Sequence, residues 1–238
     1  MFEFLKRLFS REGAATPRAP ERRIERPAPK PAPGKIELAT SGPQALTEED
    51  RADISDIVGK LAQGGFDTRE EILDAARYYV SDPSTLTTAD REWIGATVER
   101  AINQKRREEA SWPATTEWDR LDGAFEALAD QGIVALHNAG YTMADGREEV
   151  AEAARDWRRA VRPVGYVFYH GQDVERAIVG DRLMLAYGAF AGAGATTTQI
   201  GERVVTTLRR AGFKVEAPKD DDERIAVLGL DWRKRSPV

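Results

Sequence analysis

Residues 164–176 have the sequence Val-Gly-Tyr-Val-Phe-Tyr-His-Gly-Gln-Asp-Val-Glu-Arg. The first six are rich in β-branched and aromatic side chains, which favour a strand. The following polar residues precede a short helix that we expect over residues 173–179. A buried strand that runs through a polar turn into a helix is typical of a sheet covered by helices. This stretch therefore predicts a mixed helix and sheet fold, with a candidate site where the strand ends.

The same alternation of helices and strands extends over residues 111–238. Capping residues predict helices that start at Thr116, at Asp145 (through Trp157) and at Thr196. Apolar runs predict strands at residues 133–136, 164–169, 182–187, 213–216 and 224–228. The order is α-β-α-β-α-β-α-β-β, which indicates an α+β or α/β domain with a mixed sheet and a terminal hairpin.

Residues 44–110 have the pattern of a separate helical module. Three pairs at the spacing of a capping box mark the helix starts: Thr47 with Asp50, Thr68 with Glu71, and Thr87 with Asp90. Apolar residues follow each pair at helical spacing, and we expect them to form a core. No catalytic motif occurs in this module.

The amino-terminal 43 residues differ from the rest in charge and composition. Residues 1–12 predict a short amphipathic helix with Phe2, Leu5 and Phe9 on one face. Two interpretations stay open: residues 2–11 make weak peripheral contact with a membrane or dock a partner, or they form a frayed chain end. Residues 13–43 are rich in proline, alanine and arginine, which predicts a disordered linker.

Composition excludes several functional classes. The chain has 238 residues, no cysteine, two histidines and a formal net charge of -5. Disulfides, thiol catalysis and iron–sulfur ligation are therefore excluded. Residues 1–35 carry a net +5, whereas residues 36–111 carry -7 and residues 112–238 carry -3. An acidic folded part argues against nucleic acid as a partner, and the lack of a signal sequence or long apolar stretch predicts a cytoplasmic protein.

The best polar cluster follows the strand quoted first. His170 can transfer a proton near neutral pH, Arg176 can bind an anion, and Asp173 can orient a neighbour. Gln172 completes the candidate ligand-binding set at this strand end, where ligands of open sheets tend to bind. The structural alternative is that Asp173 only caps the helix and His170 is a buried strand-end residue.

A second polar cluster follows the strand at residues 133–136. It includes His137, Asn138, Tyr141 and Asp145. If the two strands are neighbours, both clusters meet at one edge of the sheet, and Tyr141 joins the candidate catalytic residues. We predict no metal, because the two histidines lack ligand spacing.

No cofactor is predicted either. Residues 188–194 are rich in glycine, but the dinucleotide-binding fingerprint lacks its third glycine because Thr197 occupies that position.

Several long strings resemble a known family. They include Thr116-Glu-Trp-Asp-Arg-Leu-Asp122, Asn138-Ala-Gly-Tyr-Thr-Met-Ala-Asp-Gly146 and Phe168-Tyr-His-Gly-Gln-Asp-Val-Glu-Arg176. These resemble an uncharacterised bacterial family catalogued as domain of unknown function 6891, over about residues 45–235. The resemblance implies a bacterial domain and supplies no catalytic residues.

Two classes of function therefore remain. The first is a non-catalytic binding or interaction protein, with an unidentified protein or small molecule as its partner, tethered through its amino-terminal helix. The alternative is an enzyme acting on a small molecule, such as a hydrolase, with His170 as general base. The sequence favours the first class, because it has no recognisable catalytic motif.

Overall fold

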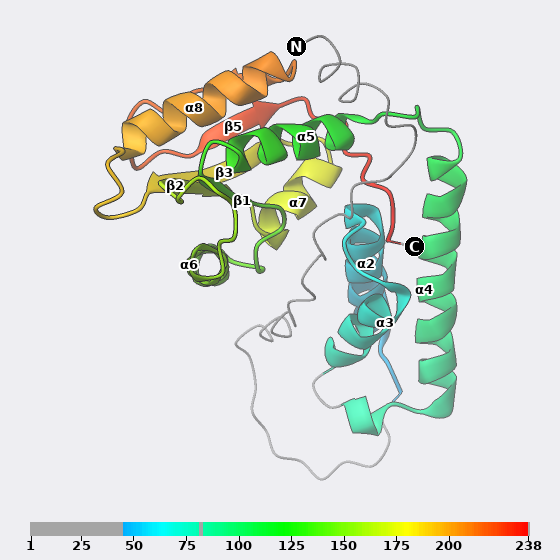
Figure 1. The fold of residues 1–238 in the computed structure, drawn as a ribbon. Coiled ribbons are helices and arrows are strands. Elements are labelled where there is room, and N and C mark those ends of the chain that lie inside the picture. Colours follow the sequence, from blue (N-terminus) through cyan, green and yellow to red (C-terminus); the bar gives the residue numbers. More distant parts are fainter. Residues whose placement is uncertain (1–44, 81–82, 238) are drawn as a thin grey trace, which may run out of the picture.

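The computed structural model describes residues 45–80 and 83–237. The expected helix at residues 1–12 and the linker at residues 13–43 lie outside these described residues. Figure 1 shows a group of helices beside a sheet that has helices on both sides. Among the described residues, none of the helices combines the length and apolar character needed to cross a bilayer.

The helical part contains α2 (Glu48–Gly64), α3 (Arg69–Tyr78), a 3₁₀ turn η1 (Pro83–Thr85) and α4 (Thr88–Glu109). Each α-helix starts where its capping pair predicts, because the threonine hydroxyls of Thr47, Thr68 and Thr87 accept a backbone N–H three residues on. Fully buried residues from all three helices, including Ile54, Val58, Ala76, Ile94 and Val98, form one core.

The remaining elements build the sheet and its cover. They are α5 (Glu117–Ala129), β1 (Ile133–Leu136), α6 (Met143–Arg155), β2 (Gly165–Phe168), α7 (Gly171–Ile178), β3 (Leu183–Ala189), α8 (Thr197–Arg210), β4 (Lys214–Glu216) and β5 (Ile225–Leu228). The strand order is β1-β2-β3-β5-β4. Only β1 and β2 are parallel, and the other pairs are antiparallel, including the terminal hairpin. The fold is mixed α+β, with helices first and a mixed sheet after them.

Side chains alternate between the two faces of the sheet, as the pleat requires. Val167, Tyr169 and Leu185 belong to the large core that α5 and α8 cover. Phe168 and Ala186 belong to a smaller core with Val150 of α6. Helix α7 contacts both β3 and α2, so it connects the sheet to the helical part (Figure 1).

Two helix starts differ from the sequence prediction. Helix α6 begins at Met143 and ends at Arg155, because Thr142 caps it and Asp145 is the third residue of its capping box. The predicted start at Asp145 and end at Trp157 were therefore wrong. Helix α7 begins at Gly171 after His170, so Asp173 is inside the first turn and does not itself precede the helix.

The carboxyl-terminal segment, residues 231–237, holds the two parts together. The Trp232 indole N–H donates to Gly64 O at the end of α2, at 3.2 Å. Arg235 forms an ion pair with Asp119 of α5 at 3.2 Å, and Ser236 donates to Glu109 of α4 at 2.8 Å. The segment therefore contacts α2, α4 and α5 through side chains that are far apart in sequence.

Gly65 provides a test of this contact. Its φ is +74°, and a Cβ there would lie 2.6 Å from both Lys234 O and the Lys105 Nζ. We expect Gly65→Ala to lower the free energy of unfolding by about 2–3 kcal/mol. Alanine is strained in this left-handed backbone conformation, and its Cβ would also clash with the backbone of Lys234.

Urea unfolding of the full chain measures this change. Gly59→Ala is the matched control, since Gly59 is inside α2 and its added Cβ would contact nothing within 4 Å. The control should gain up to about 1 kcal/mol from the better helix propensity of alanine. Equal stability of Gly65→Ala and the wild type would contradict the close approach.

Candidate functional site

The parallel pairing of β1 and β2 brings their two following loops together. Leu136 pairs with Phe168 at the ends of the strands. Beyond them, Ala139 N donates to Tyr169 O at 2.8 Å, and Gly171 N donates to Gly140 O at 2.9 Å. The two polar clusters of the sequence are therefore neighbours at one edge of the sheet.

His170 is the residue that precedes α7, and its ring is almost completely buried, with 3% of the residue exposed. Its backbone N–H donates to Asp173 Oδ2 at 3.2 Å. The ring Nδ1 lies 3.3 Å from the same oxygen but makes no hydrogen bond in the described structure. Burial lowers the pKa of His170, and the opposing charge of Asp173 only partly offsets it.

Asp173 is fully buried and is surrounded by cations. Arg224 Nη2 donates to its Oδ2 and also to Met184 O. Arg176 Nη1 lies 3.4 Å from Oδ1, although half of the Arg176 side chain is exposed. The carboxylate thus joins the first turn of α7 to the start of β5 and the backbone of β3. Sequence reasoning missed Arg224, which is 51 residues away and has no local signal.

The other predicted residues form contacts between the loops. Tyr141 Oη donates to Glu175 Oε1 at 3.0 Å. Asp145 Oδ2 accepts from the backbone N–H groups of Tyr141 and Thr142, at 3.2 and 2.9 Å, so it caps α6. Gln172 contributes its backbone N–H, which donates to Tyr141 O at 3.4 Å.

Asn138 has the least usual backbone of the group. Its φ is 50°, a value that few residues other than glycine adopt. Its Oδ1 is buried and has no hydrogen-bond partner in the described structure.

A second, partly buried polar group lies beside α5, where the sequence pointed to His137 but not to its partners Tyr169 and Asp122. His137 Nδ1 is 2.8 Å from Tyr169 Oη, and its Nε2 is 3.2 Å from Asp122 Oδ1. The imidazole stacks on Phe125, with 4.3 Å between ring centroids. Burial lowers the pKa of His137 and raises that of the Tyr169 phenol. His137 therefore contacts α5, whereas His170 contacts Asp173 of α7.

The structure does not assemble these residues into a metal site. Within residues 45–80 and 83–237, no group of three or more acidic and histidine side chains is placed to hold an ion. The carboxylate of Asp173 beside His170 is bound by Arg224.

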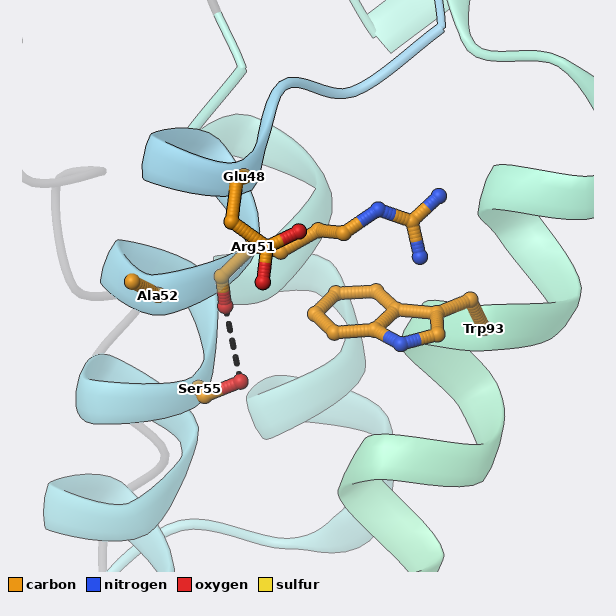
Figure 2. Close-up of a pocket in the computed structure, with 5 residues that line it drawn as sticks. All are labelled: Glu48, Arg51, Ala52, Ser55 and Trp93. Atoms are coloured by element: carbon orange, nitrogen blue, oxygen red, sulfur yellow. Dashed lines mark hydrogen bonds between the residues drawn. The ribbon is translucent and has the colours of Figure 1, made fainter.

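A surface pocket of about 420 Å³ lies elsewhere, between α2 and α4. Figure 2 shows the Arg51 guanidinium above the Trp93 ring, 4.7 Å from its centroid. Arg51 also binds the buried Asp90 at 2.9 Å. Glu48, Ala52 and Ser55 complete the lining, and none of the predicted site residues takes part.

The comparisons with known proteins give a family but no function. The family model described as "Domain of unknown function (DUF6891)" matches residues 47–236. The chain belongs to this family. The match covers both the helical part and the sheet, so the two occur together in the family model. No curated protein and no solved structure matches the chain.

The network around Asp173 gives a mutational prediction. We expect Asp173→Asn to lower the free energy of unfolding by about 3–5 kcal/mol, because Arg224 loses its buried partner. Arg176→Ala is the control and should change stability by less than about 1 kcal/mol, since its contact is long and half-exposed. Chemical denaturation measures both, and similar losses in the two variants would contradict the central role of Arg224.

The buried histidines give a prediction for pH. Both pKa values are lowered from 6.5 in the folded protein, so the unfolded chain binds more protons just below that pH. Stability from these groups is therefore present above pH 6.5 and is lost as the pH falls below it. Proton NMR of the two imidazole C2 resonances should show midpoints below 6.5. A midpoint above 6.5 for either ring would contradict its burial as a neutral group.

Proposed function

We propose that this protein is a non-catalytic interaction protein that attaches to an anionic membrane surface through residues 2–11. The burial of His170 is the observation that carries the first part of this proposal. A general base must reach within about 2.6–3.2 Å of the proton that it removes. With 3% of His170 exposed, a substrate cannot approach its ring in this conformation.

The state of Asp173 supports the same conclusion. A catalytic carboxylate that orients a histidine acts through a hydrogen bond to the ring, as in hydrolase triads. Here the carboxylate accepts the backbone N–H of His170 and the Arg224 guanidinium, while the His170 ring nitrogen makes no hydrogen bond. These contacts fasten α7 to the sheet, and the carboxylate oxygen that lies 3.3 Å from the ring Nδ1 is also bound by Arg224.

The membrane tether rests on the amino-terminal sequence. Phe2, Leu5 and Phe9 share one face of the expected helix, and Lys6, Arg7 and Arg11 share the other. A short helix of this type lies in the headgroup region of an anionic leaflet and binds it weakly. A bacterial protein in the cytoplasm meets such a leaflet at the inner face of the cell membrane, and we place the protein there. The acidic remainder of the chain argues against nucleic acid as the anionic partner.

The enzyme alternative retains one supporting observation. His170 Nδ1 and Arg224 Nε are both buried without a hydrogen bond in the described structure, and such atoms mark sites that accept a ligand or water. If α7 moved away from the sheet, a small anion could bind both groups.

Vesicle flotation of the full chain tests the tether. We expect binding to vesicles that contain phosphatidylglycerol and much weaker binding to pure phosphatidylcholine. Leu5→Glu with Phe9→Glu should lower the partition coefficient at least tenfold, because each buried apolar side chain contributes about 1.5–3 kcal/mol.

The control carries the same charge change in the linker, as Ala15→Glu with Ala28→Glu. Equal losses of binding in the two double variants would show that net charge alone governs binding, and they would contradict attachment through an amphipathic helix. A small molecule that stabilises the wild type but not a folded His170→Gln variant would instead support the enzyme alternative.

A further inference from the structure

The end of α6 and the loop after it form a short basic stretch of the described sheet part. Residues 155–162 have the sequence Arg-Asp-Trp-Arg-Arg-Ala-Val-Arg, with four arginines and one acid. Residues 112–238 as a whole carry a net -3, so this stretch stands out from an acidic background. We call residues 157–162 the arginine loop.

The arginine loop is held in one conformation by its own side chains. The Trp157 indole N–H donates to Val161 O at 2.7 Å and closes the loop. Arg159 binds Glu126 at 2.6 Å and also Asp130, so it fastens the loop to α5. Val164 N donates to Gly132 O at 2.7 Å directly after the loop. The loop is therefore anchored at its middle and at its end.

This anchoring leaves two kinds of side chain exposed on one short turn. Arg158 and Arg162 are exposed, as is Arg155 at the end of α6. Within the described part of the chain, none of these three guanidinium groups forms an ion pair with a carboxylate. Val161 lies between them along the chain, and 48% of it is exposed. Cations beside an exposed apolar residue and a tryptophan are the combination found at membrane interfaces.

We infer that the arginine loop is a second contact site for the anionic lipid surface, acting together with residues 2–11. This inference rests on the proposed membrane attachment and adds a site on the folded part. Stable attachment to a bilayer generally takes two weak signals, and a single short helix supplies only one. A duplex nucleic acid would need a longer basic face than one loop on an acidic body. An acidic protein surface would match the arginines but would not need the exposed Val161.

Binding of the full chain to phosphatidylglycerol vesicles tests the inference. Each arginine near an anionic surface contributes about fivefold in affinity. We expect Arg158→Gln with Arg162→Gln to weaken binding at least tenfold, and the remaining binding to fall further with added salt. Arg106→Gln with Arg107→Gln is the matched control, because both residues are exposed in the last turn of α4 and carry the same charge. The control should bind within about twofold of the wild type, as expected when binding depends on local charge.

The possible outcomes distinguish binding through the arginine loop from binding through residues 2–11. If Leu5→Glu with Phe9→Glu loses binding but the loop variant does not, the inference about the loop is wrong and the proposed function stands. Loss of binding by the loop variant alone would refute the tether and keep the loop as a lipid site. Equal losses of binding in the loop and control variants would contradict the inference about the arginine loop. The same holds if soluble polyglutamate competes for the protein as well as the vesicles do at the same concentration of charge. Unchanged melting temperatures would show that all variants are folded.

Discussion

The Lys234 ammonium, held between two aromatic rings, is the interaction on which the arrangement of the two parts depends. It lies 4.6 Å from the centroid of Phe66 and 4.5 Å from that of Trp118. Phe66 follows α2 of the helical part, and Trp118 belongs to α5 beside the sheet. Only 5% of Lys234 is exposed, so water contributes little to the solvation of its charge. Cation–π attraction becomes stronger under such desolvation, and it ties both parts to the carboxyl-terminal segment.

A second lysine acts at the same junction. Lys105 of α4 donates to Gln63 O at 2.9 Å, near the end of α2, which has no basic residue in its last turn. The cation therefore compensates the partial negative charge of that helix end. Burial lowers the pKa of Lys105 to about 8, with the nearby charge of Lys234 acting in the same direction and that of Glu109 opposing it. Gly65 is required here because two lysines approach the same turn of backbone.

Local signals in the sequence predicted most of the helices and strands. The contacts that the sequence analysis missed join residues that are far apart along the chain. The predicted capping pairs located α2, α3, α4 and α5, since both residues of each pair lie within four positions. The start of α6 was misplaced because Thr142 and Asp145 form a box just upstream of the assumed one. The start of α7 was missed because histidine is a rare residue before a helix.

The sequence predicted that the two strand-end loops would meet if their strands were neighbours, and β1 and β2 do pair, in parallel. The sequence did not predict that Arg224 binds Asp173 or that Tyr169 contacts His137, because these contacts depend on packing across the sheet. The sequence therefore pointed to polar residues at both strand ends but could not show that Arg224 binds the carboxylate of Asp173.

The charge distribution explains how an acidic protein can approach an anionic surface. Residues 36–238 carry a net -10, which alone would repel such a surface. At physiological ionic strength, however, charges act over a screening length of about 8 Å. Only groups that reach the surface then contribute strongly. Arg158 and Arg162 of the arginine loop are exposed, and neither forms an ion pair with a carboxylate among the described residues. The anchor of Arg159 on α5 fixes this loop relative to the sheet, so attachment through it would also set the orientation of the folded part. The proposed attachment through residues 2–11 would hold the protein near a membrane, whereas a loop fixed to the sheet would determine which face of the protein remains open to a partner.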